Sequence, residues 1–143
     1  MRTAFVLDSS VTLTWAFPDE TTKATARLLD DLVAGAEAWV PALWHLELGN
    51  VLVNAQKRGR VNRASIEIFV SRLGAFHITV DSETMARAWN KTLDLAFQYK
   101  LSTYDAAYLE LALRRNLPLA TLDDALIIAA KAAGIPLRLP IKS

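Results

Sequence analysis

Two patterns of apolar residues alternate along the chain. Short apolar runs bounded by proline, glycine or acidic residues are typical of buried strands, and apolar residues three or four positions apart are typical of helices that bury one face. The short runs predict five strands, at residues 4–7, 38–40, 76–80, 118–121 and 135–139. Helical spacing predicts a helix that follows Ser9 or Ser10 and ends at Pro18, and further helices at 22–34, 42–57, 63–73, 85–99, 103–115 and 124–133.

The alternation of strands with helices predicts an α/β fold with a mostly parallel sheet. A chain of 143 residues has the usual size of one domain, and no low-complexity linker or repeat divides it. We therefore expect one domain over residues 1–143.

Composition narrows the class of protein. Hydrophobic residues make up 52% of the chain and charged residues 22%, which favours a globular chain over a disordered one. The absence of cysteine excludes disulfides, thiolate metal sites and cysteine nucleophiles. No run approaches the ~18 apolar residues of a membrane span, and the first run stops at Asp8, too early for a signal peptide. We expect a cytoplasmic protein with no membrane partner.

Acidic residues directly follow two of the predicted strands. Asp8 follows the first strand, and Asp123 and Asp124 follow the strand at 118–121. In open α/β sheets, ligands bind outside the carboxyl ends of the strands, so we expect Asp8 and Asp123 to be neighbours in space. Each of these acids is alternatively an ordinary cap at the start of a helix.

Two more acids lie on predicted helices. Glu47 lies within an apolar helix that we expect to be largely buried, where a carboxylate needs an ion partner, a proton or a metal unless its head group reaches solvent. Asn50, one turn later, either braces Glu47 or caps a local backbone group. Asp105 opens a helix, a position that the helix dipole favours whatever the function. Tyr108 is predicted to be a packing aromatic.

The combination of these acids is more informative than each acid alone. Four carboxylates at one edge of a sheet cannot all ionise without compensation, which a hard divalent cation supplies. Ligands made only of oxygen favour Mg²⁺ or Mn²⁺ over Zn²⁺, and His45 and His77 lack a ligand-spaced partner. We therefore predict a metal site whose carboxylates lie within roughly 10 Å of one another. Its candidate ligands are Asp8, Glu47, Asp105 and Asp123.

The distribution of charge adds a second candidate surface. The net charge is only +1, but setting aside the five acids named above leaves 16 basic residues against 10 acidic ones, a balance that suits a nuclease with an acidic pocket. Basic residues gather around one predicted turn between helices, at Lys57, Arg58, Arg60 and Arg63. This cluster either binds RNA phosphates or is a solvated turn with basic residues at a helix C-terminus.

Four motifs carry a more specific likeness: VLDSSV at 6–11, PALWHLELGN at 41–50, YDAAYLELA at 104–112 and PLATLDDAL at 118–126. In this order they resemble the motifs of PIN-domain proteins of the VapC toxin family. The resemblance implies a three-layer α/β/α sandwich with a parallel sheet of about five strands. It also implies a Mg²⁺- or Mn²⁺-dependent endoribonuclease, usually a homodimer, that a VapB-type antitoxin neutralises. We expect that antitoxin to lie across an apolar groove near Trp15, Phe17 or Trp44.

The resemblance also assigns roles to single residues. The four candidate ligands match the family's acidic quartet, and Ser10 and Thr121 match the small hydroxyl positions beside it. The family pattern does not require an acid at Asp124. Asp8 and Asp105 are our first choices for direct metal ligands. The other two acids of the quartet bind a second metal, bind through water, or orient the attacking water.

Three other functions fit the sequence less well. An aspartyl-phosphate phosphatase needs a second acid two positions after its nucleophilic aspartate, where this chain has Ser10. A dinucleotide-binding fold needs a glycine-rich loop after the first strand, which the sequence lacks. A catalytically silent PIN-like module that binds RNA or protein is disfavoured by the full acidic quartet, but a sequence alone does not distinguish it from an active enzyme.

Overall fold

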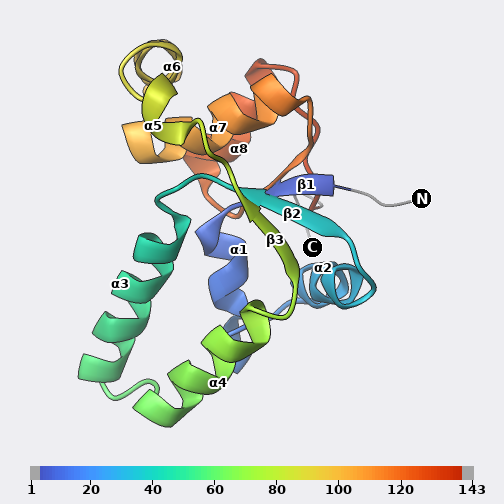
Figure 1. Cartoon of the computed structure of the whole chain (residues 1–143), viewed down its shortest axis with the longest axis vertical. Helices are drawn as coiled ribbons and strands as arrows, with labels where there is room; N and C mark the ends of the chain where they lie inside the picture. Colours follow the sequence, from blue (N-terminus) through green and yellow to red (C-terminus); the bar gives the residue numbers. More distant parts are fainter. Residues whose placement is uncertain (1–3, 140–143) are drawn as a thin grey trace.

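A parallel sheet lies at the centre of the fold (Figure 1). The computed structural model describes residues 4–139, and its strands are β1 (Ala4–Leu7), β2 (Glu37–Val40), β3 (His77–Val80) and β4 (Leu119–Ala120). Their order is β3-β2-β1-β4, and neighbouring strands pair in parallel. Val6 of β1 is in register with Trp39 of β2 and Leu119 of β4. The carboxyl ends of β1 and β4 therefore lie side by side.

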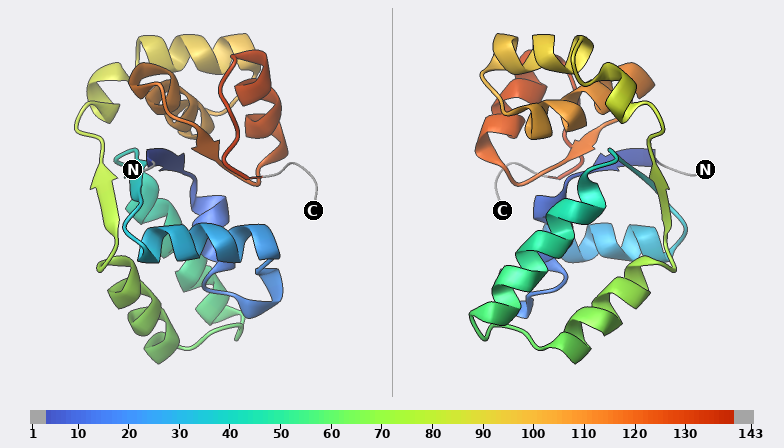
Figure 2. Two further views of the ribbon diagram at one scale, coloured as in Figure 1. Left: turned by 90° about the vertical axis from the view of Figure 1, so that its right-hand side faces the viewer. Right: turned by 60° about the vertical axis from the view of Figure 1, so that its left-hand side comes forward.

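Helices cover both faces of the sheet and make three layers (Figures 1 and 2). Below the sheet in Figure 1 lie α1 (Ser9–Thr14), α2 (Lys23–Val33), α3 (Trp44–Lys57) and α4 (Arg63–Leu73), with a short 3-10 helix at Pro18–Glu20. Above it lie α5 (Thr84–Arg87), α6 (Lys91–Tyr99), α7 (Thr103–Arg115) and α8 (Asp124–Ala132). The predicted three-layer α/β/α fold is confirmed. No helix in residues 4–139 has the length and apolar character of a bilayer-spanning segment.

The core forms where α7 packs against the central strands. Phe5, Val6 and Leu7 of β1 are fully buried, as expected for a parallel strand that is covered on both faces. Every residue of α7 from 106 to 112 is buried. Because close packing encloses so much of α7, the helix has little freedom to rotate or slide, and the side chains along it are held in fixed positions.

The predicted fifth strand at 135–139 is wrong, and within residues 4–139 the sheet has four strands. The segment makes only an isolated parallel bridge between Leu137 and Leu119. Two hydrogen bonds support it, from Leu119 N–H to the Pro136 carbonyl and from Arg138 N–H to the Leu119 carbonyl. Pro136 has no N–H to donate, which limits how far a ladder extends along this segment.

The single helix predicted over 85–99 is also wrong, because the chain divides there into α5 and α6. Asn90 lies between them, with backbone angles outside the helical region, and its side chain accepts a hydrogen bond from Lys91 N–H. Asparagine competes in this way with helical backbone bonds. Met85 and Trp89, which lie close to this break, are 77% and 90% exposed.

A buried ion network joins α7 to the end of β3. Arg114 donates to both carboxylate oxygens of Asp81, at 3.1 and 2.7 Å, and to Oε2 of Glu110 at 2.9 Å. Thr84 donates to Asp81 at 3.0 Å and accepts from the backbone N–H of Ala42, just before α3, at 3.1 Å. Burial alone would raise the pKa of Asp81, but hydrogen bonds from Arg114 and Thr84 and the charge of Arg114 outweigh it, so this pKa is lowered. The network therefore fixes α7 relative to β3 and to the start of α3.

Replacing Arg114 with Met should lower the free energy of unfolding by about 3–5 kcal/mol, because it leaves the buried carboxylates of Asp81 and Glu110 without their cation. Urea denaturation monitored by circular dichroism measures the change. The control is Arg87→Met, which removes an exposed ion pair to Glu83 and should cost less than about 1 kcal/mol. Equal effects of the two substitutions would contradict a special role for Arg114.

Candidate active site

Asp8 lies at the carboxyl end of β1 and is only 4% exposed. It occupies the N-cap position of α1, yet its side chain makes no capping hydrogen bond. Instead, Oδ2 accepts hydrogen bonds from the hydroxyls of Ser10 and Thr121, each at 2.7 Å. Oδ1 has a long contact of 3.5 Å from the Ser9 hydroxyl, and a hydrogen bond from the backbone N–H of Ser10 to this carboxylate also lowers its pKa. Both predicted hydroxyl positions therefore contact Asp8, and both do so at the same carboxylate oxygen.

The same hydroxyls connect Asp8 to the start of α8. Thr121 Oγ1 accepts from the N–H of Asp123 at 3.1 Å, and Ser10 Oγ accepts from the N–H of Leu122 at 3.0 Å. Oδ2 of Asp123 accepts from Leu126 N–H at 2.9 Å and so caps α8. Asp123 is thus both a helix cap and a neighbour of Asp8, the two alternatives that the sequence left open. Asp124 is exposed in the first turn of α8.

Glu47 approaches this region from α3. Its Oε1 accepts hydrogen bonds from the phenol of Tyr108 at 2.5 Å and from the Ser9 hydroxyl at 3.5 Å. The expectation of a largely buried helix is wrong, since α3 buries one face and leaves Leu46 80% exposed. Glu47 is half-buried at the edge of the buried face, and Asn50, which is exposed, is not among its hydrogen-bond donors.

Asp105 lies in the first turn of α7, where Ser102 caps the helix by accepting the Asp105 N–H at 3.0 Å. Burial, followed by the charges of Asp123 and Asp8, raises the pKa of Asp105 to about 6 against the opposing effect of a hydrogen bond with Ser102. A large part of this carboxyl group is therefore protonated near pH 6.

The carboxylates act on one another electrostatically. Burial raises the pKa of Asp8 against the hydrogen bonds from Thr121 and Ser10, and the charge of Asp123 adds to the increase. Burial also raises the pKa of Glu47 despite the hydrogen bond from Tyr108, and the charges of Asp8 and Asp105 contribute. We call Asp8, Glu47, Asp105 and Asp123 the acidic cluster.

The acidic cluster is not a closed coordination shell. Within residues 4–139, no three acidic or histidine side chains are gathered tightly enough to form a ready-made metal site. The spacing of roughly 10 Å that metal ligation demands stays a prediction.

The basic residues predicted to bind RNA have different surroundings. All four are exposed: Lys57, Arg58, Arg60 and Arg63. Arg60 donates to Asp19 and Glu20, each at 3.0 Å, and its guanidinium lies 4.2 Å from the centre of the Phe17 ring. Arg63 pairs with Glu67 at 3.2 Å. Exposed pairs of this kind are weak and exchange readily with other anions, so they leave the predicted role in RNA binding untested.

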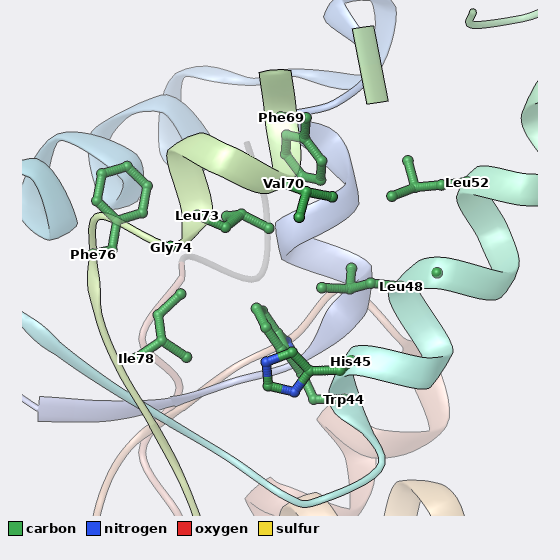
Figure 3. A pocket seen from close by; sticks show the side chains of 11 residues that line it. Trp44, His45, Leu48, Leu52, Phe69, Val70, Leu73, Gly74, Phe76 and Ile78 are labelled. Atoms are coloured by element: carbon green, nitrogen blue, oxygen red, sulfur yellow. The ribbon is translucent and has the colours of Figure 1, made fainter. Parts of the chain in front are cut away.

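An apolar groove lies between α3, α4 and β3, with a volume of about 300 Å³ (Figure 3). Its walls come from α3, from α4 and from the segment that leads into β3, and they include Trp44, His45, Leu48, Leu52, Phe69, Val70, Leu73, Phe76 and Ile78. Trp15 lines a second cavity on the other side of α4. Of the three aromatics predicted near a groove, Trp44 and Trp15 line cavities, and Phe17 is buried beneath Arg60.

Comparison with known proteins identifies the family. A family model described as the PIN domain matches residues 5–132. The chain belongs to the PIN domain family. No curated protein sequence matches it.

Solved structures share the fold of this PIN domain. It is similar to PAE2754 from Pyrobaculum aerophilum, with a TM-score of 0.68 and 22% identity, over 90% of this chain and 86% of that chain. It is also similar to a chain of VapBC2 from Rickettsia felis bound to a DNA fragment from their promoter (TM-score 0.62, 15% identity, 94% and 96% coverage). A third similar chain belongs to a toxin–antitoxin complex from Klebsiella pneumoniae (TM-score 0.55, 20% identity, 83% and 86% coverage).

Sequence reasoning missed two members of the site of this PIN domain, Tyr108 and the hydroxyl of Ser9. Tyr108 is fully buried, as expected of a packing aromatic, but its phenol also contacts Glu47. A usable signal was present, because position 108 lies one helical turn after Asp105 and a buried tyrosine hydroxyl usually has a polar partner. Ser9 was considered only as a helix cap, and its sequence position gives no sign of the contact with Glu47.

Replacing Asp105 with Asn should stabilise the metal-free PIN domain at pH 8. The Asp105 pKa is raised from 3.8 to about 6, so the stability that its bound proton provides is present below pH 4 and lost as the pH rises through 6. The gain at pH 8 should be about 1–2 kcal/mol, less than two pKa units would give, because solvent screens a partly exposed group.

Urea denaturation in EDTA at pH 4 and pH 8 measures this gain, which should vanish at pH 4. Asp124→Asn is the control, since this exposed acid at the start of α8 is favourably placed and its loss should not stabilise the protein. A gain for Asp105→Asn that is the same at both pH values would contradict the electrostatic explanation.

Proposed function

We propose that this PIN domain is a Mg²⁺- or Mn²⁺-dependent endoribonuclease, the toxin of a VapBC-type toxin–antitoxin pair. The observation that carries the proposal is the acidic cluster near the carboxyl ends of β1 and β4. Burial and the charges of neighbouring acids of the cluster raise the pKa of Asp8, Glu47 and Asp105. Membership of the PIN domain family supports a nuclease, and the order of the four motifs supports a toxin of this type.

The residues of the acidic cluster fit a hard divalent cation. The donor set is made only of carboxylate oxygens, which Mg²⁺ and Mn²⁺ prefer. Oδ1 of Asp8 has no short hydrogen bond from a described side chain, and neighbouring negative charge opposes full ionisation of Asp105. A bound divalent cation would neutralise negative charge on the scissile phosphate and make a water molecule more acidic.

The side chains have separate roles in this proposal. Asp8 and Asp105 hold the cation directly, and Ser10 and Thr121 fix the carboxylate plane of Asp8 through its other oxygen. Glu47 and Asp123 complete the coordination or orient the attacking water. Because water is the nucleophile, no side chain forms a covalent intermediate with RNA.

Substrate and partner contacts are assigned to other surfaces. The exposed basic residues Lys57, Arg58, Arg60 and Arg63 are proposed to contact RNA phosphates. A VapB-type antitoxin is proposed to lie along the groove of Figure 3, and two copies of the chain are proposed to form a homodimer. The toxin–antitoxin complexes among the similar structures support an antitoxin partner.

Replacing Asp8 with Asn should abolish RNA cleavage, because it removes the charge at the most buried acid of the cluster while keeping its size. The loss should be at least about 10³-fold, on the scale of other electrostatic site deletions. Initial rates on a fluorescent single-stranded RNA with 5 mM Mg²⁺ or Mn²⁺, and again in excess EDTA, measure the effect. The control Asp94→Ala removes an exposed acid on α6 and should keep full activity. Undiminished cleavage in EDTA, or by Asp8→Asn, would refute the mechanism.

Replacing Val70 with Glu should weaken capture of the antitoxin at least about tenfold, because it places a charge in an apolar interface. Val70 lines the groove and is 53% exposed, so the fold should tolerate the change. Affinity is measured after co-expression with a VapB-type antitoxin, against the control Ile128→Glu at an exposed position of α8. Equal affinity of the two variants would place the antitoxin elsewhere.

A further inference from the structure

We propose that Tyr108 is a positioning residue for Glu47: its phenol holds one carboxylate oxygen of Glu47 and so keeps that carboxylate in place for ligation beside Asp8. The inference rests on the proposed function and adds a residue to it. Tyr108 is fully buried, so its side chain is not placed to touch RNA, and it acts through Glu47. The two residues lie on α7 and α3, 61 positions apart in the chain.

The contact between Tyr108 and Glu47 is directional. The phenol donates to Oε1 of Glu47 at 2.5 Å, in the range of short O–H···O⁻ hydrogen bonds. The only other side-chain donor to Glu47 among the described residues is Ser9, to the same Oε1 at a long 3.5 Å. Both contacts lie on one oxygen, Oε1, so the phenol fixes the position of the Glu47 carboxylate next to the Ser9 hydroxyl.

Glu47 needs such a contact because its own helix constrains it little. It is half-buried, and its neighbour Leu46 is 80% exposed. A glutamate side chain loses about 1.5–2 kcal/mol of rotamer entropy when it is fixed in one conformation. Tyr108, in contrast, lies in the enclosed part of α7, and the ion pair of Arg114 with Asp81 holds the far end of that helix. The better-fixed helix therefore sets the position of the glutamate on the more exposed helix.

Asp8 follows the same pattern. Two hydroxyls hold its Oδ2 at 2.7 Å, while Oδ1 has the longer 3.5 Å contact from the Ser9 hydroxyl. The Ser9 hydroxyl thus lies between Oδ1 of Asp8 and Oε1 of Glu47. In both acids, short bonds from protein hydroxyls to one oxygen orient the carboxylate, which is how outer-shell partners orient metal ligands in proteins.

The first test measures Mn²⁺ binding to the Tyr108→Phe variant in the absence of RNA, by electron paramagnetic resonance and by calorimetry. Phenylalanine fills the same volume, so the far-ultraviolet circular dichroism spectrum should be unchanged. The Kd for Mn²⁺ should rise 10- to 100-fold, the range for loss of an outer-shell partner. The matched control is Tyr99→Phe, a half-buried tyrosine on α6 that should change the Kd less than twofold. Wild-type affinity in Tyr108→Phe would overturn the proposal.

The second test separates positioning from packing. In a Glu47→Ala background, Tyr108→Phe should change the Mn²⁺ affinity less than twofold, because its target is already absent. An additive loss in the double variant, or no loss from Glu47→Ala alone, would overturn the proposal while leaving the nuclease standing. If wild-type protein bound no Mn²⁺, the proposed function itself would fail together with this inference.

A third variant tests the same contact from the side of Glu47, so its result does not depend on whether Tyr108→Phe folds normally. Glu47→Asp keeps the charge but shortens the side chain by one methylene, which withdraws the carboxylate from the phenol. It should lose Mn²⁺ affinity at least tenfold, and adding Tyr108→Phe should cause little further loss. Retention of wild-type affinity by Glu47→Asp would show that the contact does not position the ligand.

Discussion

The burial of the Asp8 carboxylate at the carboxyl end of β1 is the constraint on which the rest of the site depends. A buried carboxylate is strongly destabilising unless polar groups replace its water shell. Here the hydroxyls of Ser10 and Thr121 do so, and the same two hydroxyls accept the backbone N–H groups of Leu122 and Asp123. The hydrogen bonds that replace the water shell of Asp8 therefore also fix the turn from β4 into α8, which places Asp123 beside Asp8. The same hydrogen bonds therefore solvate Asp8 and position Asp123, although the two acids are far apart in the sequence.

Helix α7 positions the other side chains of the site. Residues of α7 face the site at one end, with Asp105 and Tyr108, and face the end of β3 at the other, where Arg114 meets Asp81. The enclosed middle of α7 holds these two ends in a fixed relation to each other, because a close-packed core deforms little. As a result, α3, which is exposed along much of its length, is fixed at its N-terminal end in two ways. Tyr108 of α7 contacts Glu47 directly, and Arg114 of α7 acts through Asp81 and Thr84 on the backbone of Ala42.

Periodicity predicted the elements whose boundaries depend on local signals. The helices at 63–73 and 103–115 were placed to the residue, and the strand-end positions of Asp8 and Asp123 followed from the order of elements. Features that depend on side chains distant in sequence were not predictable. Nothing local indicates that Tyr108 meets Glu47 across 61 positions, or that one face of α3 stays open to solvent. The break at Asn90 was missed because apolar spacing continued through a residue whose own side chain ends the helix pattern.

Helix geometry explains how one fold tolerates so many acids together. Asp8 and Asp123 occupy N-cap positions, and Glu47 and Asp105 lie in first turns, so four helix N-termini meet the acidic cluster. Each N-terminus favours a nearby negative charge by roughly 0.3–1 kcal/mol. This compensation is incomplete, because burial and mutual repulsion still raise the pKa of Asp8, Glu47 and Asp105. The fold therefore places these carboxylates within electrostatic reach of one another but leaves the cluster short of positive charge. At low pH, bound protons neutralise part of the negative charge of the cluster. Under the proposed function, a divalent cation neutralises it at neutral pH, so that activity depends on cation binding.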